Sequence, residues 1–351
     1  MKTEIITLNS QRNVTLTAYL QPVAGEFYNI AKRPAILVLP GGGYTMCSDR
    51  EADPVALTYL QAGYQAFVLR YSVGKHAIWP APLEDLEQAI ALIRANADEW
   101  NLYPDKLAVV GFSAGGHLAG CAATMAKNKP NAVILGYAAV EGETIQNYHP
   151  TAPDVISAVN YDTCPCFIFS TRTDNMVPIR NSVKMMAALT EYDISYESHI
   201  YSYGPHGFSV ANSSCLTPGQ KMTNRVRDWV VDNLEWLREV FGDFGWNAMT
   251  PPACNGRING NHDEVLSVDC TVAHLMRNPA AAAMIQPMMS ASTEGYQDYL
   301  GNEEDKAENE PTMNAALLME TMSLRDILGF GQVSAEQVGQ IDSALRQIPN
   351  T

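Results

Sequence analysis

Short, continuously apolar segments alternate with stretches of helical periodicity, and this alternation restricts the fold of the chain more than any other feature. The apolar segments occupy residues 35–39, 66–69, 107–110, 133–135 and 167–170. Helical spacing lies between them, most clearly over 83–97, where Leu86, Ile90 and Ile93 recur at steps of three and four residues. Strands without a polar face, each followed by a helix, predict a mostly parallel sheet that helices cover on both faces. In such α/β folds the functional residues gather at the carboxyl ends of the strands.

The chain is predicted to contain a large α/β domain and a small C-terminal module. The α/β domain spans residues 1–241, beginning with two alternating strands and ending with a helix over 222–241. Residues 242–261 are rich in Gly, Pro and Asn, which is typical of a linker. Residues 262–351 are expected to form a small acidic helical module. Its predicted parts are helices over 271–276, 280–289, 313–322 and 335–348, and an exposed acidic loop over 302–310.

Composition limits the partners of the chain. With 351 residues, of which 46% are hydrophobic, the chain can bury a sizeable core. The formal net charge is -15, and the acidic excess is concentrated after Asp243. Because a negatively charged surface repels phosphate groups, we expect neither a nucleic acid nor an anionic membrane as a partner.

The N-terminus and the cysteines predict a cytoplasmic protein. The sequence begins with a polar segment that lacks an apolar run followed by a small-residue cleavage site, so no signal peptide is expected. The sequence has no run of about 18 apolar residues, the length that a membrane span requires. The seven cysteines are scattered, and the nearest pair, Cys164 and Cys166, has neither zinc-site nor redox-motif spacing. Reduced thiols in the cytoplasm are therefore expected.

Ser113 is the candidate nucleophile. It lies between Gly111 and Gly115, directly after an apolar strand and directly before a helix rich in small residues. A strand-to-helix turn this sharp leaves no room for side chains two residues before and after the serine. It also holds the serine in a strained conformation with its hydroxyl exposed. The alternative is a glycine-rich turn that only packs the helix onto the sheet.

A glycine loop supplies the candidate donors of an oxyanion hole. Residues 40–44, Pro-Gly-Gly-Gly-Tyr, follow the strand over 35–39, and glycines let backbone N–H groups approach a ligand closely. The predicted donors to the oxyanion of an acyl-transfer reaction are the N–H groups of Gly42, Gly43 and Ala114. A phosphate-binding loop is disfavoured, because no Gly-Lys-Ser/Thr follows and the spacing is not Gly-x-Gly-x-x-Gly. A plain structural turn is the other alternative.

His206 and Asp174 are the candidate base and its orienting carboxylate. A serine hydroxyl needs a general base, and the base needs a carboxylate to fix its tautomer. His206 follows the last predicted strand and Asp174 follows the strand before it, which gives the chain order Ser, Asp, His. Asp174 also suits a helix cap, and Asp162 is a reserve candidate that precedes its strand. His117, one turn into the helix after Ser113, is predicted to pack behind the nucleophile.

Together these motifs resemble the acetyl-esterase and acetylxylan-esterase-like branch of the α/β-hydrolases. The resemblance rests on Pro40-Gly41-Gly42-Gly43-Tyr44, Arg70-Tyr71, Trp79-Pro80-Ala81-Pro82, Gly111-Phe112-Ser113-Ala114-Gly115-Gly116-His117, Asp174 with Val177-Pro178, and His206-Gly207-Phe208. It covers roughly residues 1–241. It implies an α/β-hydrolase fold and the hydrolysis of short acyl esters, often acetyl groups on sugars, without a metal or organic cofactor. Pro40 replaces the His of the His-Gly-Gly-Gly motif of hormone-sensitive-lipase relatives, so that subfamily is not implied. Residues 324–328 are similar to helical extensions of gut-bacterial glycoside hydrolases, which favours carbohydrate esters.

The combined prediction is a serine esterase that hydrolyses short-chain, acetyl-type esters on carbohydrates or oligosaccharides. The short excursion between Tyr137 and Thr163 favours an open site for small acyl groups. The candidate substrate-binding residues are Tyr44, Trp79, Tyr148, His149, Met176 and Phe208. Their aromatic rings suit stacking on a sugar or ordinary packing equally well.

Two other functions stay open at this stage. A peptidase or formamidase of the same fold would use the same catalytic groups on an amide. A non-catalytic binding or scaffold protein would keep only the hydrolase fold. The methionines and alanines of the C-terminal module suit a core, a homo-oligomer interface or a cover over the pocket mouth. The expected partner of the site is a small acyl ester or an acetylated oligosaccharide.

Overall fold

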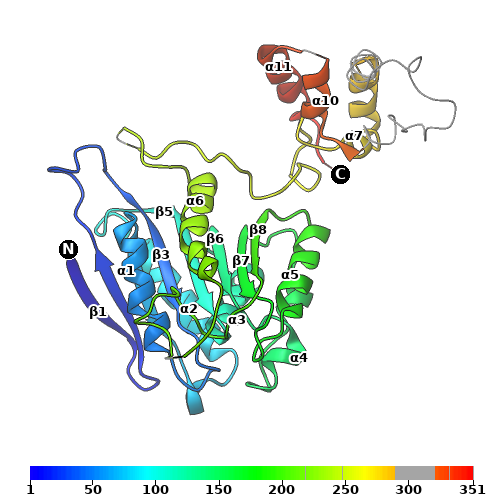
Figure 1. The fold of residues 1–351 in the computed structure, drawn as a ribbon. Coiled ribbons are helices and arrows are strands. Elements are labelled where there is room, and N and C mark those ends of the chain that lie inside the picture. Colours follow the sequence, from blue (N-terminus) through cyan, green and yellow to red (C-terminus); the bar gives the residue numbers. More distant parts are fainter. Residues whose placement is uncertain (218, 247, 289–320, 332, 351) are drawn as a thin grey trace. The chain divides into compact units, whose positions relative to one another are not determined.

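The computed structural model of the chain divides into two compact units, Met1–Gly256 and Arg257–Thr351 (Figure 1). It describes residues 1–217, 219–246, 248–288, 321–331 and 333–350. The division falls after Gly256, within the segment 242–261 for which the sequence predicts a linker.

The first unit is built on an eight-stranded sheet of order β1-β2-β4-β3-β5-β6-β7-β8. The strands are β1 (Lys2–Asn9), β2 (Val14–Leu20), β3 (Arg33–Leu39), β4 (Gln65–Arg70), β5 (Leu102–Phe112), β6 (Ala132–Gly136), β7 (Cys166–Thr171) and β8 (Tyr196–Tyr201). β2 pairs antiparallel with both β1 and β4, and all other neighbours are parallel. The carboxyl ends of β3 to β8 therefore meet at one edge of the sheet.

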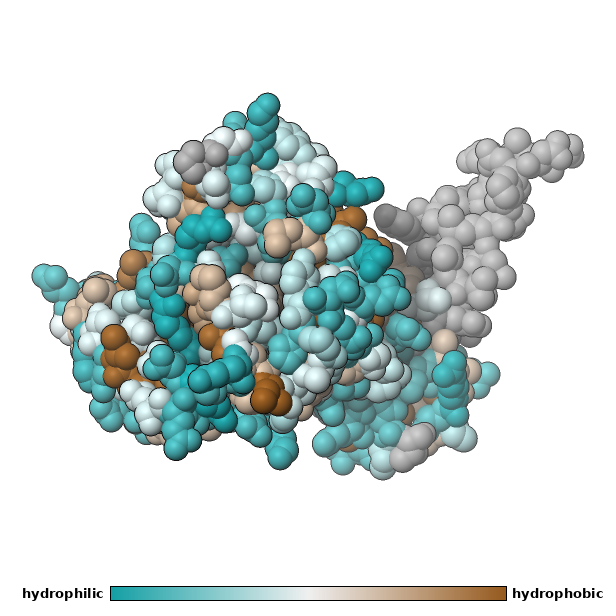
Figure 2. All heavy atoms as spheres, turned by 90° about the horizontal axis from the view of Figure 1, so that it is seen from below, coloured by the Kyte–Doolittle hydropathy of each residue, from teal (hydrophilic) through white to brown (hydrophobic). Residues whose placement is uncertain are grey.

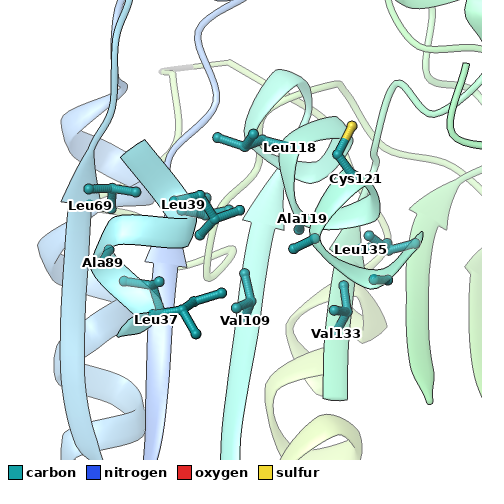
Figure 3. Packing of buried hydrophobic residues seen from close by; sticks show 14 of the residues in the cluster. Leu37, Leu39, Leu69, Ala89, Val109, Leu118, Ala119, Cys121, Val133 and Leu135 are labelled. Carbon is teal, nitrogen blue, oxygen red and sulfur yellow. The ribbon is translucent and has the colours of Figure 1, made fainter. Parts of the chain in front are cut away.

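Different helices bury the two faces of this sheet. The helices are α1 (Asp53–Gln61), α2 (Ala81–Ala95), α3 (Ala114–Thr124), α4 (Gly142–Ile145), α5 (Arg180–Glu191) and α6 (Trp229–Phe241). Leu37 and Leu39 of β3 belong to a core with residues of α2, α3 and α5, as the close-up in Figure 3 shows for α2 and α3. Ile36 and Val38 belong to a core with residues of α1 and α6. Burial on both faces accounts for the unbroken apolar strands, and the predicted α/β-hydrolase architecture is confirmed.

The last helix of the first unit is shorter than predicted. The apolar spacing predicts a helix over 222–241, but residues Asn224–Asp228 form a 3-10 helix and α6 begins at Trp229. Met222 and Val226 pack into the same core as α6. The periodic burial that indicated a single helix thus continues through a segment of different backbone geometry.

The second unit has its own helices and its own core. It contains α7 (Val272–Leu275), a helical segment over 279–288, α10 (Leu324–Phe330) and α11 (Ala335–Leu345). The serine hydroxyls of Ser323 and Ser334 cap the first turns of α10 and α11. The core comprises Leu266, Val268, Cys270, Val272, Leu275, Ala281, Ile285, Leu324, Ile327, Leu328 and Leu345.

The structure agrees in part with the helices that the sequence predicts for this unit. α7 and α11 lie within the predicted ranges 271–276 and 335–348, and both are shorter. The predicted loop over 302–310 and nearly all of the predicted helix over 313–322 lie outside the described residues.

The surface is mainly polar on the face seen from below in Figure 1, where apolar residues lie singly or in small groups (Figure 2). Among the described residues, the structure contains no helix with the length and apolar character needed to cross a membrane.

We predict that a chain ending at Gly256 folds as the first unit does in the full chain. The first two cores lie wholly before Gly256 and the third lies wholly after it. All five tryptophans also precede Gly256, so tryptophan fluorescence during urea unfolding reports on the first unit alone. The free energy of unfolding should agree between the two chains within about 0.5 kcal/mol. A clearly lower urea midpoint in the shortened chain would show that the first unit needs the second.

Candidate active site

Ser113 occupies a strained turn between β5 and α3. Its backbone has φ 53 and ψ -116, a conformation that side chains rarely adopt. A Cβ on Gly111 would lie 2.1 Å from the carbonyl oxygen of Gly115, and a Cβ on Gly115 would lie 2.2 Å from that of Leu39. Neither position has room for a side chain, as the sequence predicts. The tight packing of backbone on backbone holds the serine at the edge of the sheet.

Ser113, His206 and Asp174 form one hydrogen-bonded chain. The hydroxyl of Ser113 donates to His206 Nε2 at 2.8 Å, and His206 Nδ1 donates to Asp174 Oδ2 at 2.7 Å. Asp174 is fixed in turn because its Oδ1 accepts the backbone N–H groups of Met176 and Val177, both at 2.9 Å. The Asp174 carboxylate is fully buried, and 11% of the His206 side chain is exposed. The carboxylate thus orients an imidazole whose other nitrogen faces the serine.

The reserve carboxylate does not take part in this chain. Asp162 precedes β7, whereas Asp174 follows it, so the two lie toward opposite ends of the strand. The structure places Asp174 against His206 and leaves Asp162 at the edge remote from Ser113.

The predicted oxyanion-hole residues line one cavity together with Ser113 and His206. Gly42, Gly43 and Ala114 all belong to its wall. Within the described part of the chain, no group accepts a hydrogen bond from the N–H of any of these three residues. Ala114 is also the first residue of α3, whose N-terminal end favours negative charge. Three unengaged donors therefore border the space beside the serine.

His117 lies behind the nucleophile, as the sequence predicts. The hydroxyl of Tyr44 donates to its Nδ1 at 2.7 Å, and its Nε2 donates to the carbonyl oxygen of Pro153 at 2.9 Å. The carbonyl oxygen can only accept, so Nε2 carries a proton, and in the neutral imidazole Nδ1 then accepts from Tyr44. Burial is the main cause that lowers the pKa of His117 to about 4. His117 is therefore a neutral part of the core and not a second base.

The cavity beside Ser113 has a volume of about 660 Å³. Its wall mixes apolar and polar side chains, and these come mainly from the loops that follow β3, β6 and β7. The lining side chains outside the triad and the glycine loop are Thr45, Met46, Ser48, Arg50, Glu51, Ala139, Ile145, Asn147, Tyr148, Met176 and Gln220. Met46, Glu51 and Gln220 also line the cavity although no sequence motif includes them. Met46 and Glu51 follow the glycine motif in the same loop, and Gln220 comes from the segment after the base.

Two of the six predicted substrate-binding residues lie in this wall. Tyr148 and Met176 line the cavity, and the Tyr148 hydroxyl donates to the backbone oxygen of Met176 at 3.1 Å. Of the six predicted residues, these two can therefore contact a ligand in the cavity.

The other four predicted residues are not part of this cavity wall, and burial corrects the assignment of Tyr44 and Phe208. Tyr44 is 2% exposed, and its ring contacts Trp79 and His149 edge to face. Its φ is 58, and its hydroxyl bonds to the buried His117. Phe208 is fully buried against Tyr137. Aromatic residues beside a catalytic motif indicate core packing as well as ligand contact. Here Tyr44 and Phe208 form core, whereas Trp79 and His149 are half-buried.

The described residues contain no group of three or more His, Cys, Asp or Glu side chains placed to hold a metal ion.

Comparisons with known proteins place the first unit among esterases. A family model named BD-FAE matches residues 28–149. Endo-1,4-beta-xylanase B of Butyrivibrio fibrisolvens is 33% identical over 211 residues, which cover 52% of this chain and 33% of that protein. The acetylxylan esterase of Xylanibacter ruminicola is 29% identical over 196 residues, covering 50% of this chain and 41% of that protein. The chain thus spans well under half the length of these two relatives.

Solved structures match about two thirds of this chain over nearly their whole length. The α/β hydrolase MGS-M1 from a Medee basin deep-sea metagenome library is 42% identical, with a TM-score of 0.63, and the match covers 68% of this chain and 98% of that one. The acetyl ester-xyloside bifunctional hydrolase of Caldicellulosiruptor lactoaceticus is 26% identical, with a TM-score of 0.59, and the match covers 68% of this chain and 96% of that one.

We predict that His117 makes the protein less stable in acid. The unfolded imidazole binds a proton below its ordinary pKa of 6.5, whereas the buried one stays neutral until about pH 4. Stability is therefore lost as the pH falls through this window, by about 2–3 kcal/mol from this group. Urea unfolding at pH 7.5 and pH 4.5 should show a smaller loss for His117→Gln, which keeps one acceptor and one donor. Equal losses in both proteins would contradict the assignment.

Proposed function

The chain belongs to the α/β-hydrolase family, and several of its named relatives are esterases. From this premise we propose that it is a serine esterase for short acyl groups. The proposed substrates are acetyl esters on carbohydrates or oligosaccharides. The observation that carries the proposal is the hydrogen-bonded chain Ser113–His206–Asp174 beside three unengaged backbone N–H groups in one cavity. Acyl transfer by a serine needs these parts together.

In the first half of the reaction, Ser113 becomes acylated. Its Oγ attacks the ester carbonyl carbon while His206 Nε2 takes the hydroxyl proton, and Asp174 stabilises the resulting imidazolium. The carbonyl oxygen becomes an oxyanion, which the N–H groups of Gly42, Gly43 and Ala114 bind. When the tetrahedral intermediate collapses, the bond to the alcohol oxygen breaks. His206 returns the proton to that oxygen, so the alcohol leaves neutral.

In the second half, water releases the acid. His206 takes a proton from a water molecule, whose oxygen attacks the carbonyl carbon of the acylated Ser113. The same backbone groups bind the second oxyanion. The bond to Ser113 Oγ breaks, the proton returns to the serine, and the carboxylic acid leaves. Every proton in this cycle moves through His206, so the reaction needs no metal and no organic cofactor.

The size and lining of the cavity support a small acyl group on a polar alcohol. A volume of about 660 Å³ lies within the usual range for small-molecule sites, about 300–1,000 Å³. It exceeds what an acetyl group fills, so space remains for the alcohol part. Asn147 and Gln220 offer amide groups to hydroxyls in that space, and Tyr148 offers an aromatic ring. The printed names of two relatives, an acetylxylan esterase and a xylanase, support a sugar as the alcohol.

We predict that Ser113→Ala abolishes turnover. Removal of the nucleophile should lower kcat by at least about 10⁴-fold on p-nitrophenyl acetate and on acetylated xylo- and manno-oligosaccharides, measured as released acetate. Ser182→Ala is the matched control, because Ser182 is buried on α5 and bonds to Ser170 instead of to the site. Wild-type rates in Ser113→Ala would exclude the mechanism. Turnover of the model ester alone would exclude the sugar, and turnover of amides only would indicate a peptidase or formamidase.

We also predict a preference for short acyl chains. The loops after β6 and β7 place Tyr148 and Met176 across the cavity, so a long chain has to displace them or extend into solvent. The ratio kcat/KM should be at least about tenfold higher for p-nitrophenyl acetate than for p-nitrophenyl octanoate. A faster reaction with the octanoate would show that the cavity accepts long acyl chains.

A further inference from the structure

A buried carboxylate lies directly under the glycine loop. Glu51, the last residue of the 3-10 helix Asp49–Glu51, is 4% exposed and borders the cavity. Its Oε2 accepts the backbone N–H of Gly41 at 2.9 Å, and its Oε1 accepts the hydroxyl of Tyr137 at 2.6 Å. The sequence analysis gave this residue no role, and the triad and oxyanion hole do not use it directly.

The segment 48–51 fixes the glycine loop on both sides of Gly41. The carbonyl oxygen of Gly41 accepts the N–H of Ser48 at 2.9 Å, while its own N–H goes to Glu51. Because both polar groups of Gly41 point to this segment, its peptide planes are held in one orientation. The next two N–H groups, those of Gly42 and Gly43, are left for the cavity.

The same segment fixes the loop that carries the base. The Tyr137 hydroxyl, which donates to Glu51, accepts the N–H of Ser209 at 3.0 Å. Ser209 also donates its hydroxyl to the backbone oxygen of Arg50. The ring of Tyr137 lies edge to face against His206, with 5.0 Å between the ring centroids. One carboxylate therefore connects the oxyanion loop to the loop of the base.

The chemistry of this network does not resemble an ordinary stabilising ion pair. A carboxylate without compensating partners is costly to bury. In the described part of the chain, Glu51 forms no ion pair with a lysine or arginine, and its oxygens accept two directional hydrogen bonds instead. Burial raises the pKa of the Tyr137 hydroxyl well above its ordinary value, so it keeps its proton and donates. Both bonds are thus defined in direction and hold specific backbone groups.

We propose that Glu51 is a positioning residue that holds the oxyanion loop and the base loop in register for the reaction. This inference rests on the proposed esterase function. Glu51 does not touch the reacting atoms, and it acts through Gly41 on one side and through Tyr137 and Ser209 on the other. An acyl-transfer site depends on such register, because a misplacement of about 1 Å lowers the rate by about 10²-fold.

The test begins with Glu51→Gln. The amide oxygen can still accept from Gly41, but the amide NH₂ then faces the Tyr137 hydroxyl and can only donate to it. The Tyr137 hydroxyl, which also accepts the N–H of Ser209, thereby loses the acceptor of its own proton. We expect kcat/KM for p-nitrophenyl acetate, normalised to titrated active sites, to fall about 10- to 100-fold. A short trifluoromethyl ketone forms a tetrahedral adduct with the serine and needs the oxyanion hole. Its inhibition constant should rise by a similar factor, while KM changes little.

Two further variants separate positioning from stability. Asp85→Asn is the matched control, because Asp85 is also a fully buried carboxylate, with Ser72 and Arg12 as its donors. It should lower the urea midpoint and leave kcat/KM per active site unchanged. Tyr137→Phe keeps the ring and removes the hydroxyl, so it should lower kcat/KM through the same network. In the double variant with Glu51→Gln, the loss should be smaller than the product of the two single losses.

The outcomes distinguish this inference from the proposed function. If Glu51→Gln and Tyr137→Phe both keep wild-type kcat/KM and wild-type inhibition by the ketone, the positioning role is wrong although the esterase stands. The rate at which a fluorophosphonate modifies Ser113 requires no ester turnover. If the wild-type protein turns over no ester, the proposed function is wrong. The rate of Ser113 modification in the two variants then still tests whether Glu51 positions the site. An unchanged modification rate in both variants overturns the inference.

Discussion

The position of the catalytic serine depends on a contact between two backbones, that of the β5–α3 turn and that of the end of β3. The carbonyl oxygens of Leu39 and Pro40 lie 2.2 and 2.4 Å from the place that a Cβ on Gly115 would take. Because only a glycine permits this approach, the first turn of α3 packs against β3, the strand that continues into the glycine loop. The strained backbone of Ser113, which costs about 1–3 kcal/mol, is sustained by this packing. Nucleophile and oxyanion loop are neighbours for the same reason.

The register of the parallel strands brings the other two catalytic side chains to the same edge. Phe112 lies opposite Gly136, Gly136 opposite Phe169, and Phe169 opposite His199. Ser113, Asp174 and His206 follow the ends of β5, β7 and β8 by one, three and five residues, respectively. A one-residue slip of a strand would turn its side chains to the opposite face of the sheet and disrupt the packing of both cores. The hydrogen-bonded chain Ser113–His206–Asp174 is therefore a consequence of core packing as much as of its own two bonds.

The sequence was sufficient for the features that repeat along the chain or that obey a steric rule. Unbroken apolar strands separated by helices predict the sheet, and glycines on both sides of Ser113 predict the turn. The sequence did not predict the direction in which individual side chains point. Tyr44 and Phe208 stand next to catalytic motifs, but both pack in the core, where Tyr44 bonds to the buried His117 and Phe208 contacts Tyr137. Glu51 was missed because no motif includes it and because its partner Tyr137 lies far away in the sequence, after a different strand.

The polar network beneath the site explains why this region is not packed with apolar side chains alone. Apolar replacements for a buried carboxylate and a buried tyrosine hydroxyl often leave stability equal or higher, because desolvation of polar groups offsets what their bonds contribute. Hydrophobic contacts, however, fix no orientation of a peptide plane. An oxyanion hole made of backbone N–H groups needs that orientation, and no side chain of the loop can supply it where the residues are glycines. The segment 48–51 fixes the orientation of these peptide planes from outside the glycine loop, through directional bonds to Gly41. By way of Tyr137 it also bonds to the loop of the base. The buried polar groups of Glu51 and Tyr137 thus restrict the backbone flexibility that the glycines would otherwise allow next to the substrate.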